Sequence, residues 1–121
     1  MDGRLEDYKD LIVWKRAMEL ASAAYGIAKM LPREETFALA NQIRRSSVSI
    51  PSNIAEGYGR NTSKEYARFL SLARGSAYEL ETQMMLCVQV GYFEENDLST
   101  VFGLANEVIR MLNVIIPKLG N

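Results

Sequence analysis

The sequence predicts an all-α protein, an antiparallel up-down four-helix bundle, and three observations support this fold class. Apolar residues recur at alternating spacings of three and four along four long segments, the spacing of helices that pack in bundles. Short links rich in proline, glycine or charge join the segments, and short links make consecutive helices antiparallel neighbours. No stretch alternates apolar and polar residues as a strand does. With 121 residues, the chain is expected to form a single domain over 1–121.

The first helix is expected from about residue 7 to residue 31, where Pro32 ends it. Two adjacent apolar seams give this helix a wide apolar face that can contact more than one neighbour. One seam comprises Leu11, Trp14, Met18, Ala21, Tyr25 and Ala28, and the other comprises Val13, Ala17, Leu20, Ala24, Ile27 and Leu31. Gly26 costs about 1 kcal/mol relative to alanine inside a helix. We expect close approach of a neighbouring helix to explain it.

The second helix is expected over residues 37–57, after the charged link Arg33–Glu35 and with Thr36 as its N-cap. Its apolar face comprises Leu39, Ile43, Ile50 and Ile54. Pro51 removes one backbone hydrogen bond and presses on the carbonyl of residue 47, so we expect one helix with a bend. The hydroxyls of Ser47 and Ser49 are available to the backbone groups freed there. Gly57 and Gly59 are expected to end the helix in the left-handed conformation.

The third helix is expected to begin at a capping box, with Thr62 as the N-cap and Glu65 at the third helical position. Its seam alternates four and three and comprises Tyr66, Leu70, Ala73, Ala77, Leu80, Met84, Cys87 and Gly91. Gly91 is the expected terminator, and small residues from 73 to 77 make the middle of the helix slim.

The last helix is expected to start near Asn96 or Asp97, and Pro117 and Gly120 close the chain. Its seam comprises Leu98, Val101, Ala105, Val108, Leu112, Ile115 and Leu119. A second apolar line comprises Phe102, Ile109 and Ile116. This line either faces another subunit or belongs to a broad core face, and the sequence leaves both readings open.

Residues 42–60 carry the most specific sequence signal, centred on the run Ser-Ile-Pro-Ser-Asn-Ile-Ala-Glu-Gly at 49–57. Together with Phe69-Leu70 and the run 73–76, this stretch resembles the four-helix-bundle proteins encoded in intervening sequences of bacterial large-subunit ribosomal RNA genes. The accessory variability (Avd) proteins of diversity-generating retroelements are related to them, and the similarity extends from about residue 11 to residue 92. The resemblance implies a four-helix bundle, a ring-shaped homopentamer and no established enzymatic activity. For the retroelement branch it also implies binding to nucleic acid and to a reverse transcriptase.

The composition excludes several kinds of site. The chain has no histidine, which removes the commonest general base and the commonest transition-metal ligand. Its single cysteine, Cys87, cannot form an internal disulfide or a cysteine zinc site. We therefore expect no catalytic residue, no metal and no cofactor. No uninterrupted apolar run approaches the length of a membrane span, and the first residues are polar, so we expect a cytoplasmic protein with no membrane partner.

Charge is distributed unevenly although the net charge is only −1. Residues 42–75 hold six basic and two acidic residues, a net of +4, whereas residues 76–109 hold six acidic residues and no lysine or arginine. Arg60, Lys64 and Arg68 lie at or just beyond the turn after the second helix, with few acids expected nearby, and are the candidate phosphate-binding residues. The isoelectric point of about 5.5 weighs against a dedicated nucleic-acid binder.

A second polar group calls for a structural explanation, because arginine pairs bidentately with carboxylates. It comprises Arg44, Arg45, Asn53, Glu56, Arg74 and Glu79. We expect a hydrogen-bond and ion-pair network within or between subunits, with phosphate contact as the alternative. The sequence thus favours a non-catalytic, ring-forming interaction module, pentameric by resemblance, that binds nucleic acid or a nucleic-acid-handling protein through a basic rim. The alternative is a protein-binding scaffold without a nucleic-acid role.

Overall fold

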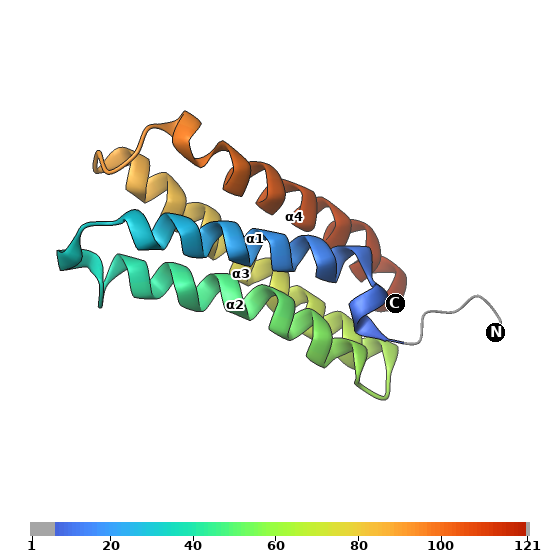
Figure 1. Cartoon of the computed structure of the whole chain (residues 1–121). Coiled ribbons are helices and arrows are strands. Elements are labelled where there is room, and N and C mark those ends of the chain that lie inside the picture. Colours follow the sequence, from blue (N-terminus) through green and yellow to red (C-terminus); the bar gives the residue numbers. More distant parts are fainter. Residues whose placement is uncertain (1–6, 121) are drawn as a thin grey trace.

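Four antiparallel helices lie side by side in the computed structural model, which describes residues 7–120 (Figure 1). They are α1 (Ile12–Met30), α2 (Leu39–Tyr58), α3 (Ser63–Gln89) and α4 (Ser99–Gly120). Three short 3-10 helices precede α1, α2 and α4, at Tyr8–Asp10, Arg33–Glu35 and Glu95–Leu98. No strand occurs among the described residues. The expected all-α four-helix bundle is confirmed.

The four helices form a square. Consecutive helices pack against each other, and α1 packs against α4 to close the square. The start of α1, the α2–α3 turn and the end of α4 lie at one end of the bundle (Figure 1). The α1–α2 and α3–α4 links lie at the other end. The basic turn after α2 and the acidic link before α4 are therefore at opposite ends.

The core consists largely of seams that the spacing predicts, although one of the two seams of α1 is partly exposed at Met18 and Tyr25. On α3, every seam residue from Leu70 to Cys87 is completely buried, and on α2 the same holds for Ile43, Ile50 and Ile54. On α4, Ile109 is buried, while Phe102 and Ile116 pack against the core of their own subunit. The second apolar line of α4 thus belongs to a broad core face.

The first helix begins later than expected, because the chain at Leu11 is extended, with ψ of 128°. Asp7 accepts a hydrogen bond from the Lys9 backbone N–H at 3.0 Å and caps a separate 3-10 turn. The Tyr8 ring in that turn meets the Trp14 ring edge-on, with the ring centroids 5.4 Å apart. The single helix expected from residue 7 is therefore a short turn followed by α1.

The start of α2 also differs from the expectation, since Thr36 closes the preceding 3-10 turn and does not cap the helix. The Glu35 carboxylate does this instead, accepting the Leu39 backbone N–H at 3.2 Å. It also accepts a hydrogen bond from the Tyr92 hydroxyl, with the two oxygens 2.6 Å apart, although the two residues are 57 positions apart in the sequence. This carboxylate joins the two links at the acidic end of the bundle.

As expected, α2 continues through Pro51 as one helix. The serine hydroxyls have other partners than the carbonyl that proline frees. Ser47 donates to the Arg44 carbonyl at 3.0 Å, and Ser49 accepts from Asn53 at 2.9 Å. Ser49 also accepts from the Ser76 hydroxyl of α3 at 2.8 Å, so these serines contribute to helix pairing.

Glycine has a different role at each position. Gly57 lies inside α2, and Gly59 follows the helix with φ of −84°. The left-handed helix end expected at these two glycines is therefore not found. A Cβ on Gly57 would lie 2.7 Å from Phe69 Cβ, so glycine is required there for the contact between α2 and α3. Gly91 ends α3 with φ of +90°, as predicted. Nothing lies within 4 Å of a Cβ on Gly26, so the close approach expected there is not found within the subunit.

The hydrogen bond between Tyr92 and Glu35 predicts a specific pH dependence of stability. The bond to the carboxylate, together with burial, raises the pKa of Tyr92 from 10.0 to about 12. A raised pKa stabilises the fold fully below the unfolded value of 10 and loses that contribution as the pH rises towards 12. We therefore expect Tyr92→Phe to lower Tm at pH 8, and the difference from wild type to narrow between pH 10 and 12. Tyr78→Phe, the same change at a tyrosine that is 48% exposed, is the matched control, and Tm is measured by thermal scans across this pH range.

The same bond acts on Glu35 in the opposite direction. Hydrogen bonds from Tyr92 and from the Leu39 backbone lower the pKa of Glu35 below 4.5. Its contribution to stability is therefore present above the unfolded pKa and lost as the pH falls through the folded one. If the difference in Tm between wild type and Tyr92→Phe stayed constant from pH 8 to pH 12, the hydrogen bond between Tyr92 and Glu35 would be contradicted.

Candidate functional site

Arg60, Lys64 and Arg68 lie at the end of the bundle where α2 turns into α3, and all three are exposed. Two of them are paired with carboxylates. Arg60 Nη2 donates to Glu56 Oε2 at 2.6 Å, and Arg68 Nε donates to Glu65 Oε2 at 3.2 Å. The expectation of few nearby acids was wrong. These pairs could have been predicted from the sequence, because Glu56 and Arg60 are four residues apart and Glu65 and Arg68 are three residues apart, the spacings at which helical side chains interact.

Phe69 organises the same two arginines. The Arg60 and Arg68 guanidinium carbons lie 4.5 and 4.7 Å from the centre of its ring, which is the range of cation–π contacts. Phe69 is 7% exposed, and its Cβ lies against Gly57 of α2. A guanidinium has five N–H donors, so each arginine keeps donors for a further acceptor after binding its carboxylate. This arrangement can therefore present oriented donors to phosphate, at a smaller net charge than the sequence suggests.

The six residues of the expected polar network do not bond to one another within one subunit. Asn53 donates to the Ser49 carbonyl at 2.8 Å, Glu56 pairs with Arg60, and Arg74 Nη1 donates to Asn113 Oδ1 of α4 at 2.8 Å. Arg45 and Glu79 are exposed. The reason is helical geometry, because Arg45 points outward from α2 and Glu79 outward from α3.

Arg44, Arg45 and Glu79 make no ion pair among residues 7–120. Two unpaired cations and one unpaired carboxylate therefore remain on the outer surfaces of α2 and α3. Pairing between subunits stays a prediction for these residues.

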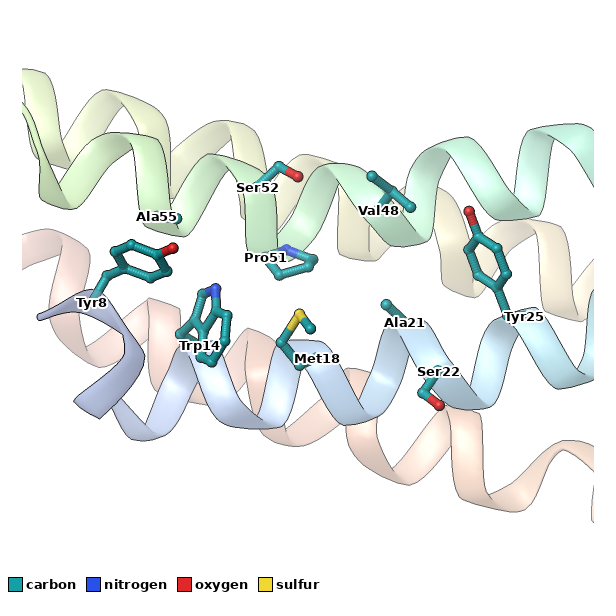
Figure 2. A pocket seen from close by; sticks show the side chains of 10 residues that line it. All are labelled: Tyr8, Trp14, Met18, Ala21, Ser22, Tyr25, Val48, Pro51, Ser52 and Ala55. Carbon is teal, nitrogen blue, oxygen red and sulfur yellow. The ribbon is translucent and has the colours of Figure 1, made fainter.

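An apolar groove runs between α1 and α2 (Figure 2). Its volume is about 410 Å³. The side chains that line it are Tyr8, Trp14, Met18, Ala21, Ser22, Tyr25, Val48, Pro51, Ser52 and Ala55. In Figure 2 the aromatic rings and Met18 project from the α1 side towards α2. The groove arises because one of the two seams of α1 covers the core and the other remains partly exposed.

A second hollow, of about 590 Å³, adjoins this groove over the outer face of α2. The two share Tyr25, Val48 and Ser52. Arg44 and Arg45 line the second hollow, so the apolar groove leads into a region with positive charge. The sequence pointed to surplus apolar surface on the first helix, but it did not place the arginines beside that surface.

Two candidate nucleophiles, Ser47 and Cys87, lie in the described part of the chain, and both are buried. The Ser47 hydroxyl is buried and donates to a backbone carbonyl. Burial raises the pKa of the Cys87 thiol, which lies in the core, so it is a poor nucleophile. Over the described part of the chain, no group of three or more acidic or cysteine side chains is placed to hold a metal ion.

One segment, Glu95–Leu119, is long and apolar enough to cross a membrane by length and composition alone. Val101, Ala105, Val108 and Leu112 of this segment are in the bundle core, and 28% of its most apolar window is buried. Core helices of water-soluble bundles pass the same test.

The fold and its surfaces define a small helical-bundle protein with an apolar groove on one side and arginines at one end. The chain belongs to the family of 23S rRNA-intervening sequence proteins, whose family model matches residues 9–114. It is also similar to a crystal structure from Bacteroides thetaiotaomicron, described as a protein with unknown function from the S23 ribosomal protein family. That structure superimposes with a TM-score of 0.81 at 25% identity, covering 87% of this chain and 98% of the other. No curated protein matches.

Proposed function

We propose that this protein is a non-catalytic, ring-forming homo-oligomer that presents its basic end as a rim to nucleic acid. The observation that supports assembly is apolar surface that the subunit core does not use. The groove between α1 and α2 is lined by aromatic rings, and the outer face of α3 exposes Leu72, Tyr78, Met85, Leu86 and Val90. Several large hydrophobic side chains exposed on one side of a helix are typical of protein interfaces. The number of five subunits rests on the family resemblance alone.

The proposed rim consists of Arg60, Lys64 and Arg68. A cyclic ring repeats these residues once per subunit, so weak phosphate contacts add up to useful avidity. Phe69 holds two of the guanidinium groups over its ring, and their remaining N–H donors supply the phosphate contacts. The rim is thus oriented before any partner binds.

The assembly is tested by light scattering coupled to size exclusion. We expect a mass near five chains at micromolar concentration. A mass of 13.6 kDa, that of one chain, at every concentration would refute the oligomer.

Nucleic-acid binding is tested by titrating a fluorescent RNA hairpin against the protein at low and at physiological salt. Electrostatic binding must weaken steeply with salt, because phosphate neutralisation releases counterions. The double change Arg60→Glu with Lys64→Glu should weaken binding at least tenfold and reduce the salt dependence. Arg33→Glu, at the opposite end of the bundle, is the matched control and should leave binding unchanged.

A protein-binding scaffold without a nucleic-acid role is the second candidate. The observation that favours it is the pairing of Arg60 and Arg68 with Glu56 and Glu65, which reduces the charge available at the rim. Under this alternative, an intact oligomer shows no RNA binding even at low salt. Partners such as a reverse transcriptase would then be sought among co-purifying proteins.

A further inference from the structure

Five large hydrophobic side chains are exposed on the outer face of α3, which we call the α3 ridge: Leu72, Tyr78, Met85, Leu86 and Val90. Leu72, Tyr78 and Leu86 are 47%, 48% and 45% exposed. Removal of apolar surface from water favours association.

The middle of this ridge is slim and carries one acid. Gly75 lies on the exposed side of α3, and nothing is within 4 Å of a Cβ built on it. Glycine is less favourable than alanine in a helix, and no close contact inside the subunit requires glycine at this position. Glu79, one turn further along, is exposed and has no ion pair in the described chain. These are the features of a surface that another chain approaches closely.

The α1–α2 side of the subunit carries the complementary features. Its groove is concave and apolar, and Arg44 and Arg45 lie where it opens onto the outer face of α2. Charge and shape therefore match the α3 ridge, with unpaired cations beside a groove on one side and an unpaired carboxylate on a ridge on the other.

The two surfaces also lie at corresponding heights along the bundle. Ser46 donates to Gln83 at 2.7 Å, so this serine and glutamine mark one level on α2 and α3. Arg45 precedes Ser46 by one residue and Glu79 precedes Gln83 by four, and because α2 and α3 are antiparallel these offsets add up to about 7.5 Å along the bundle. The hydrogen bond from Ser76 to Ser49 is a second marker, and from it Glu79 and Arg45 are offset towards the same end by three and four residues, so their levels differ by about 1.5 Å. In a ring of bundles standing parallel to its axis, residues that meet must lie near one level. Arg45 and Glu79 satisfy this condition to within about one and a half helical turns.

We propose that the groove between α1 and α2 of one subunit receives the outer face of α3 of a second copy of this chain, with Arg45 paired to Glu79. The inference deepens the proposed oligomer and depends on it. Because α1 and α3 occupy diagonal corners of the bundle, one subunit can use both surfaces at once. A contact between two different surfaces is heterologous, and such contacts close into rings when the rotation permits. The arrangement explains the exposed ridge, the open glycine and the unpaired charges together.

Charge reversal tests this pairing by light scattering. Arg45→Glu and Glu79→Arg each place like charges in the contact, and like charges across an interface suppress association. We expect each single variant to elute at the one-chain mass of 13.6 kDa where the wild type is assembled. The double variant, which exchanges the two charges, should regain the wild-type mass. Arg110→Glu, an exposed arginine on α4, is the matched control and should stay assembled.

If wild type and both single variants share one large mass, the proposed contact is wrong while the oligomer stands. If the wild type itself has the mass of one chain at all concentrations, the oligomer and this contact both fail. Circular dichroism of each variant shows whether a loss of mass reflects a loss of helix.

Cross-linking tests the same contact without charge reversal. Ser52 lines the groove and Gly75 lies on the ridge, so Ser52→Cys with Gly75→Cys places one thiol on each surface. A short bis-maleimide should link chains of this double variant into a ladder beyond two, and neither single variant should form one. Native Cys87 is completely buried and serves as the internal control. A ladder that stops at two chains, or no linkage in an intact oligomer, would overturn the heterologous contact.

Discussion

Replacing Leu80 with alanine is expected to lower the free energy of unfolding by about 2–5 kcal/mol, because it leaves a cavity in a close-packed core. Leu80 is 0% exposed and lies at the middle of α3, within the central apolar cluster. The measurement is urea unfolding followed by circular dichroism at 222 nm. Protein concentration must be held fixed, because assembly adds to the apparent stability.

Met30→Ala is the matched control for this experiment. Met30 is 62% exposed at the end of α1, and its side chain has as many heavy atoms as that of leucine. We expect its free energy of unfolding to stay within about 0.5 kcal/mol of wild type, as is usual for surface changes. If Leu80→Ala and Met30→Ala lowered the free energy of unfolding by the same amount, Leu80 would not be in the core.

Gly57→Ala is expected to lower the free energy of unfolding by about 1–3 kcal/mol, the range for an overpacked interior. The added Cβ would lie 2.7 Å from Phe69 Cβ, closer than Cβ atoms are found in proteins, and in a tight contact of 3.1 Å with Tyr66 Cδ1. Alanine gains about 1 kcal/mol in helix propensity, which offsets only part of the strain. Because Phe69 also orders Arg60 and Arg68, the change should alter the basic end as well as stability.

Glycine-to-alanine changes at open positions provide the comparison. Nothing lies within 4 Å of a Cβ on Gly26 or Gly103, which are exposed on α1 and α4. Alanine at either position should raise the free energy of unfolding by up to about 1 kcal/mol. If Gly57→Ala stabilised the protein as these two do, α2 and α3 would be further apart than the structure places them.

The helices and their core faces could be predicted from the sequence, because helical periodicity is a property of consecutive residues. The seam from Leu70 to Cys87 was identified by spacing alone and is completely buried. Local end signals worked as well. The Thr62 hydroxyl accepts the Glu65 backbone N–H at 3.1 Å, and Gly91 is left-handed where α3 ends.

The cap of α2 and the role of Gly57 could not be predicted, because they depend on contacts between residues far apart in the sequence. The sequence around Thr36 does not show that Glu35 caps α2. The Glu35 carboxylate is held in place by Tyr92, which lies in the link between α3 and α4. Gly57 was expected to end a helix, and only the approach of Phe69 reveals that glycine is needed for packing.

The sequence by itself therefore determined which segments are helical, which of their faces are buried, and the family to which the chain belongs. The tertiary structure decided which polar groups meet. It paired Arg60 with Glu56, kept Arg45 and Glu79 on separate outer surfaces, and placed Arg45 beside the groove between α1 and α2. The physical reason is that periodicity fixes each helix face relative to its own axis, whereas the side chains that meet depend on how each helix is rotated and positioned against the others. That rotation is set by the packing of all four helices together.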